Sequence, residues 1–190
     1  NNLTKNDKMH LVIYDDKIDV AFKDKMHTDK DFMINKVKSI VPRGSTDLYG
    51  GIKKGIDILL GKDNVPKSSG LLQNISNYFS GTSEEFSNNE PKIEDKSQIL
   101  FLFSDGMANI GITNGDDIGK KILKDCEGTN IMISTFGIGS HYDEILMSSI
   151  AFCGNGNYFY INDIKTIPKI IEMGLDGLTR YWSTDAKLQY

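Results

Sequence analysis

Three short runs of apolar residues, each nearly unbroken by a polar side chain, constrain the fold of this chain more than any other feature. They are MHLVIY at 9–14, ILFLF at 99–103 and IMISTF at 131–136. Runs of this kind are typical of β-strands covered on both faces, as in parallel sheets. Segments with helical spacing of apolar residues follow them, so we expect strands and helices to alternate along the chain.

The remaining elements follow from periodicity and from turn residues. Helices are predicted over 28–40, 48–60, 118–126, 143–152 and 164–178, and short strands over 18–22 and 158–161. Thr28 is the expected N-cap of the first helix. Right-handed connections then give a doubly wound, mainly parallel α/β sheet with helices on both faces. The 18–22 segment follows a turn and alternates in period two, which predicts one antiparallel edge strand.

The predicted domain spans 1–180 and contains a long polar segment at 61–98. That segment is rich in Ser, Asn, Gly and Glu and is longer than a tight connection needs, so we interpret it as a surface insertion. Its apolar patch at 71–79 is consistent with a docked helical turn. Residues 181–190 alternate like a strand, which fits equally well an extended tail or the first strand of a following β-rich module.

Composition excludes several classes of protein. The net charge is −4 and the basic residues are scattered, so nucleic-acid binding is not predicted. No stretch approaches the roughly 20 apolar residues of a membrane span. Cys126 and Cys153 stand apart in the sequence, which favours free buried thiols over a disulfide. Free thiols are consistent with a cytoplasmic protein but do not identify the compartment.

Two short loops carry the residue types that bind divalent metals. Asp105 follows the 99–103 strand directly and precedes a glycine, where a carboxylate serves as a metal ligand, a helix cap or part of a turn. Thr46 stands just before a helix, where a hydroxyl either caps or binds metal. Each residue alone favours the capping role. Both positions are compatible with the carboxyl edge of the sheet, where such sheets bind ligands.

The order of four segments is more specific than either residue. They are DKMHLVIYDDKIDVAF, RGSTDLYGGIKKGIDILL, QILFLFSDGMANIG and IMISTFGIGSHYDEILMSSIAFCGNGNYFYI. This series resembles the von Willebrand factor type A (vWA) domain, from the strand after its first helix through its last helix. In that family a metal-ion-dependent adhesion site (MIDAS) is assembled from a DxSxS motif, a threonine and an aspartate. The resemblance assigns the second and third roles to Thr46 and Asp105.

The chain departs from the family at the first of these elements. No DxSxS motif occurs in the sequence, and no strand precedes Met9 to carry it. In the family this strand lies between those that begin here at Met9 and Ile99. Without it two strand edges would stay unpaired. We therefore expect residues outside this sequence, or another chain, to supply both the strand and the motif; the alternative is a fold that differs from the family's.

The resemblance implies an adhesion or scaffold-type interaction module of a larger protein, without catalytic activity. Its partner's Asp or Glu would bind through Mg²⁺, Ca²⁺ or Mn²⁺, the hard cations that hydroxyl and carboxylate oxygens suit. With Thr46 and Asp105 as the only ligands, we expect weak metal binding. Two alternatives are a substrate-recruiting vWA domain of a ubiquitin ligase and a metal-independent scaffold that uses the 61–98 insertion.

Two other patterns suggest chemistry less strongly. Gly137-x-Gly139 follows a strand as a dinucleotide-binding loop would, but Tyr142 stands at the third glycine position. His141, beside Asp143 and Glu144, is better explained by a capped helix start than by acid–base catalysis. Because the sequence also has no nucleophile elbow, phosphate loop or zinc spacing, it does not predict an enzyme.

Overall fold

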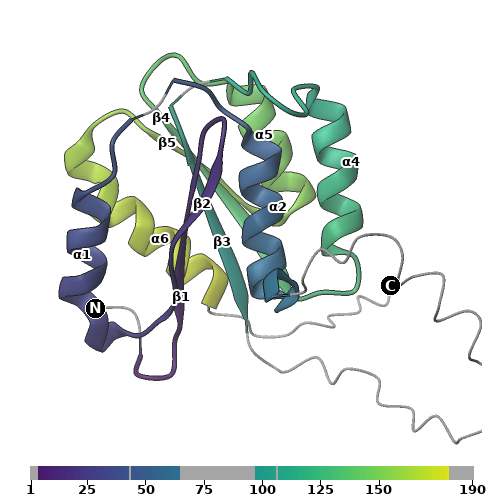
Figure 1. Cartoon of the computed structure of the whole chain (residues 1–190). Helices are drawn as coiled ribbons and strands as arrows, with labels where there is room; N and C mark the ends of the chain where they lie inside the picture. Colours follow the sequence, from purple (N-terminus) through teal and green to yellow (C-terminus); the bar gives the residue numbers. More distant parts are fainter. Residues whose placement is uncertain (1–3, 43, 65–96, 106, 180–190) are drawn as a thin grey trace, which may run out of the picture.

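The computed structural model describes residues 4–42, 44–64, 97–105 and 107–179 (Figure 1). Its main elements in chain order are β1 (Met9–Tyr14), β2 (Ile18–Lys25), α1 (Lys30–Lys38), α2 (Leu48–Leu59), β3 (Gln98–Ser104), α4 (Gly115–Cys126), β4 (Ile131–Ile138), α5 (Glu144–Cys153), β5 (Asn155–Ile161) and α6 (Ile167–Thr179). Most of the proposed insertion and the 181–190 tail lie outside the described residues, so both interpretations stay predictions.

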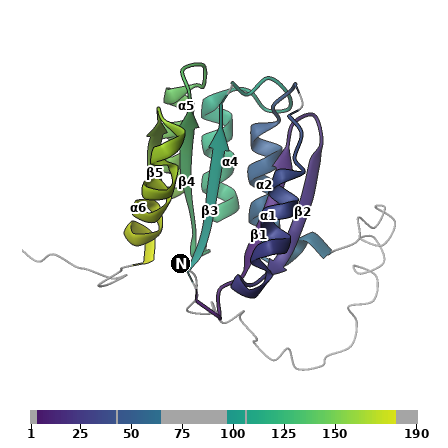
Figure 2. The same ribbon diagram turned by 90° about the vertical axis from the view of Figure 1, so that its left-hand side faces the viewer.

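The architecture confirms the predicted α/β class. Strands β3, β4 and β5 form a parallel sheet in that order, and β1 pairs with β2 in an antiparallel hairpin. Helices α2, α4 and α5 cover one face, while α1 and α6 cover the other (Figures 1 and 2). One feature differs from a continuous sheet: β1 and β3 share no ladder, so the described strands form two separate sheets.

The core on the α2, α4 and α5 side is aliphatic. Leu102 of β3 and Ile133 of β4 point to this side, where they join a cluster of fully or nearly fully buried side chains. The helices contribute Leu48, Ile52, Ile56, Ile118, Ile122, Leu146, Met147 and Ile150 to this cluster. Burying an aliphatic side chain stabilises the fold by about 1.5–3 kcal/mol. This cluster therefore fixes where the ends of the strands and their loops lie.

The opposite face of the same sheet carries an aromatic layer beneath α6. The Phe136 ring stacks on Phe103 and Phe159, with centroids 4.5 and 5.1 Å apart, and meets Phe101 edge-on at 5.0 Å. Gly174 of α6 lies over this layer; a Cβ there would come within 3.4–3.5 Å of the Phe101, Phe136 and Phe159 rings. Helix α6 thus packs on this layer at ordinary van der Waals distance.

Several element boundaries differ from the sequence-based expectation because of local capping. Helix α4 begins at Gly115 instead of 118, since the Asn114 side chain accepts a hydrogen bond from the Asp117 amide. The prediction that Thr28 caps the first helix was wrong. Thr28 lies inside a 3-10 turn (His27–Asp29), and the residue at the N-cap of α1 is Asp29. The Asp29 carboxylate does not cap α1; it accepts a hydrogen bond from the Met26 amide (3.0 Å).

Candidate functional site

The two candidate loops meet at the carboxyl edge of the strands. Thr46 lies between α1 and α2, and Asp105 follows β3 directly. The Thr46 amide donates to Asn109 Oδ1 (2.7 Å), while the Asn109 and Ile110 amides donate to the Thr46 carbonyl (3.1 and 3.3 Å). The structure thus joins the threonine loop to the loop that begins at Asp105.

A third loop, the turn after β1, is tied into the same edge. The Asp47 amide donates to the Asp15 carbonyl (2.8 Å), and the Asp47 carboxylate caps α2 by accepting from the Gly50 amide (3.0 Å). Asp15 is only 4% exposed, and its carboxylate accepts from the Lys17 amide (2.7 Å). Backbone and capping bonds therefore hold three loops in one arrangement. The position of Asp47 just before a helix is a capping signal that sequence reasoning did not use.

Tyr14, the last residue of β1, bridges the two sheets beside this edge. Its hydroxyl donates to the Phe103 carbonyl of β3 (2.6 Å), and its ring lies where a Cβ on Gly51 of α2 would be. Burial raises the pKa of Tyr14 to about 12; a hydrogen bond with Ser104 opposes this rise and the nearby Asp105 carboxylate adds to it. The Tyr14 hydroxyl is therefore neutral at physiological pH and sits within electrostatic reach of Asp105.

Among the residues after β4, an acid caps the next helix, as the sequence favoured. Asp143 caps α5 by accepting from the Leu146 amide (2.9 Å), and His141 is exposed, with Ser140 Oγ 3.2 Å from its Nδ1. Tyr142 occupies the space above Gly137 and hydrogen-bonds the Tyr158 hydroxyl. An aromatic ring therefore packs directly against the first glycine of the Gly137-x-Gly139 pattern.

The donor atoms at the carboxyl edge fit a hard cation in kind but not in number. A threonine hydroxyl and a carboxylate are oxygen ligands of the sort Mg²⁺ prefers, but Mg²⁺ takes six of them. Within 4–42, 44–64, 97–105 and 107–179, no cluster of three or more His, Cys, Asp or Glu side chains could hold a metal. Thr46 and Asp105 can therefore be only part of a ligand set.

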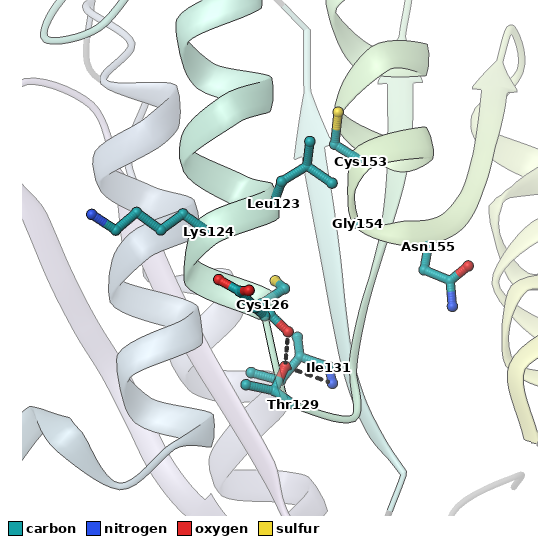
Figure 3. A pocket seen from close by; sticks show the side chains of 9 residues that line it. Leu123, Lys124, Cys126, Thr129, Ile131, Cys153, Gly154 and Asn155 are labelled. Carbon is teal, nitrogen blue, oxygen red and sulfur yellow. Dashed lines mark hydrogen bonds between the residues drawn. The ribbon is translucent and has the colours of Figure 1, made fainter.

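A cavity of about 540 Å³ lies at the other end of the domain, where α4 and α5 end and β4 begins (Figure 3). Both cysteines line it, and both are free and half-buried, where the sequence favoured free buried thiols. Burial raises the pKa of the Cys126 thiol, which keeps it protonated and poorly nucleophilic at neutral pH. Thr46 and Asp105, at the carboxyl edge, lie at the opposite end of the strands from this cavity.

No helix in the described part of the chain has both the length and the apolar character that crossing a membrane requires.

Comparisons with solved structures agree with this architecture. A von Willebrand factor type A structure from Catenulispora acidiphila aligns with a TM-score of 0.65 and 14% identity, over 93% of this chain and 35% of that one. Proximal thread matrix protein 1 from the mussel byssus aligns with a TM-score of 0.60 and 16% identity, over 92% and 37% of the two chains. A further structure of the mussel protein, at a TM-score of 0.57, is described as having a zinc-occupied MIDAS motif.

Sequence comparison gives the same family. The Escherichia coli (strain K12) protein YfbK, itself uncharacterized, is 34% identical over 91 residues. That match covers 47% of this chain and 16% of YfbK, so the chain corresponds to a small part of its curated relative. The family model of the von Willebrand factor type A domain matches residues 1–173, nearly the whole length. The chain therefore belongs to the von Willebrand factor type A domain family.

Proposed function

We propose that this chain is part of a protein-interaction module that binds an Asp or Glu of a partner protein through a divalent cation. Thr46 and Asp105 supply two of the cation's ligands, and Mg²⁺ is the expected ion, with Ca²⁺ or Mn²⁺ as substitutes. The observation that carries the proposal is the set of hydrogen bonds joining the Thr46 loop to the loop after Asp105. Domains of this family are typically interaction modules, which agrees with it.

The remaining ligands come with the strand that completes the sheet. β1 and β3 share no ladder, and the Tyr14 hydroxyl of β1 reaches the Phe103 carbonyl of β3. We place the completing strand between them. A strand in this position ends at the same carboxyl edge as β3, next to Thr46 and Asp105. Residues outside this sequence, or a second chain, supply that strand together with the hydroxyl and carboxylate ligands of a DxSxS motif.

A bound cation would supply positive charge between the Asp105 carboxylate and the partner's carboxylate, which would otherwise repel each other. The chain's own part is to hold the Asp105 carboxylate and the Thr46 hydroxyl on two connected loops at the open end of the sheet. The partner's Asp or Glu would complete the set of oxygen ligands around that cation. The mussel protein that is described with a zinc-occupied MIDAS motif has the same fold, which supports a metal at this edge.

The test replaces both ligands together in a Thr46→Ala, Asp105→Ala variant. Mg²⁺ binding is measured by calorimetry in the presence of a synthetic peptide with a continuous apolar strand that ends in Asp-x-Ser-x-Ser. We expect the double variant to bind Mg²⁺ at least tenfold more weakly than the wild type, because a loss of about 1.4 kcal/mol is a factor of ten and two ligands are lost. Without peptide, both proteins should bind weakly.

The matched control is Thr113→Ala, Asp116→Ala, which removes an exposed hydroxyl and an exposed carboxylate near the start of α4. This variant should bind Mg²⁺ like the wild type. Equal Mg²⁺ affinity of the wild type and the Thr46→Ala, Asp105→Ala variant with peptide present would contradict the metal assignment. Partner binding that survives loss of the metal would favour the metal-independent scaffold instead.

A further inference from the structure

Asn109 forms hydrogen bonds with both the amide and the carbonyl group of Thr46. Its side-chain Oδ1 accepts from the Thr46 amide at 2.7 Å, and its own amide donates to the Thr46 carbonyl at 3.1 Å. A single residue thus satisfies the donor and the acceptor of one loop residue that is 63 positions away in the sequence. Because a shift of the Thr46 peptide in either direction lengthens one of these bonds, the pair defines the position of Thr46.

The position of Asn109 is itself fixed by its neighbours. Ala108 and Ile112 pack against the aliphatic core on the two sides of the segment. Gly111 has φ +69°, and a Cβ there would come within 2.5 Å of Asp47 Oδ1. A glycine at this point therefore lets the loop turn back tightly against Asp47. Asn109 is held by the core and by this turn, so it can act as a fixed reference for Thr46.

We propose that Asn109 is a positioning residue of the cation site, which sets the Thr46 hydroxyl at the correct distance from Asp105. The inference rests on the proposed function and adds a residue that is not itself a ligand. Mg²⁺ demands near-octahedral geometry with oxygens at about 2.0–2.1 Å, so it tolerates little error in the relative placement of two loops. Supporting residues of this kind typically change metal affinity by about 10–100-fold.

The experiment compares Asn109→Ala, Asn109→Asp and the control Asn114→Ala. Aspartate keeps an oxygen acceptor at the same place, while alanine removes it. Asn114 is an asparagine of the same loop whose Oδ1 also accepts a backbone amide, that of Asp117, but it does not contact Thr46. The first readout is hydrogen exchange of the Thr46 amide by NMR in metal-free protein. The second is Mg²⁺ affinity in the presence of the strand peptide.

In Asn109→Ala, we expect exchange of the Thr46 amide to accelerate by about tenfold, since a hydrogen bond contributes about 1 kcal/mol or slightly more. Mg²⁺ affinity should fall by at least tenfold. Asn109→Asp should restore slow exchange and most of the affinity. Asn114→Ala should change exchange at Asp117 and leave both Thr46 exchange and Mg²⁺ affinity as in the wild type.

The possible failures are distinguishable. Unchanged Thr46 exchange in Asn109→Ala overturns the positioning role. Faster exchange with unchanged Mg²⁺ affinity also overturns it, while the proposed function stands if the Thr46→Ala, Asp105→Ala variant loses the metal. If that double variant binds Mg²⁺ as the wild type does, the proposed function is overturned, and the role of Asn109 in a metal site is overturned with it.

Discussion

Replacing Gly156 with alanine should destabilise the domain by about 3 kcal/mol, since overpacking a well-packed site costs about 1–3 kcal/mol and more where nothing can move. A Cβ at this position of β5 would lie 2.2 Å from the Ile133 carbonyl oxygen and 2.5 Å from its carbonyl carbon. These are backbone atoms of the neighbouring strand β4, so they cannot rotate away as a side chain could. The register between β4 and β5 shifts at this point, between Ile133 and Thr135, and the close approach of the two strands accompanies it.

Urea unfolding at pH 7 measures this effect on Gly156→Ala. Gly44→Ala is the matched control, because Gly44 is exposed and a Cβ there would meet no atom within 4 Å. The control should change the free energy of unfolding by less than about 0.5 kcal/mol. Similar unfolding midpoints for the two variants would show that β5 can move away from β4, and the described pairing would then be wrong.

Phe136→Ala should have an effect of the same size or larger, about 3–5 kcal/mol, which is typical of removing a buried phenylalanine. Phe136 is 0% exposed and contacts the rings of Phe101, Phe103 and Phe159. Its loss leaves a cavity in the middle of the aromatic layer beneath α6. Since domains of ordinary size are stable by about 5–15 kcal/mol, this variant should be close to unfolding.

Thermal unfolding followed by circular dichroism compares Phe136→Ala with Phe152→Ala. Phe152 is 87% exposed on α5, so its replacement should shift the melting temperature little. We also expect α6 to become more sensitive to proteolysis in Phe136→Ala, because the layer against which it packs is broken. A melting temperature equal to that of Phe152→Ala would mean that the aromatic layer contributes little to stability.

The centre of the fold could be predicted from sequence because its strands are long apolar runs. The run in β4 is buried along nearly its whole length, as the pattern predicts, whereas β1 and most of β3 are half-buried. The start of β5 could not be predicted in this way. Its first residues, Asn155 to Asn157, have the composition of a turn, and they form a strand only because Gly156 fits against the backbone of Ile133. That contact joins residues far apart in the chain.

In the candidate site, too, local sequence pattern reveals some residues, while others depend on contacts between distant parts of the chain. Thr46 and Asp105 were identified from motif order and from their positions beside predicted strands and helices; their role as ligands stays a proposal. Asn109 and Tyr14 carried no local signal, because their roles depend on partners 63 and 89 residues away. Asp47 is intermediate: its capping position could be seen from sequence, but its hydrogen bond to the Asp15 carbonyl could not.

The separation of β1 and β2 from β3, β4 and β5 has a consequence for how the domain unfolds. No backbone ladder joins the two sheets in the described part of the chain, so the hairpin can open without disrupting the parallel strands. Such subglobal opening costs less than global unfolding. A strand seated between β1 and β3 would pair with both and merge the two units into one cooperative unit. Such a strand would therefore be expected to make the unfolding of the domain more cooperative.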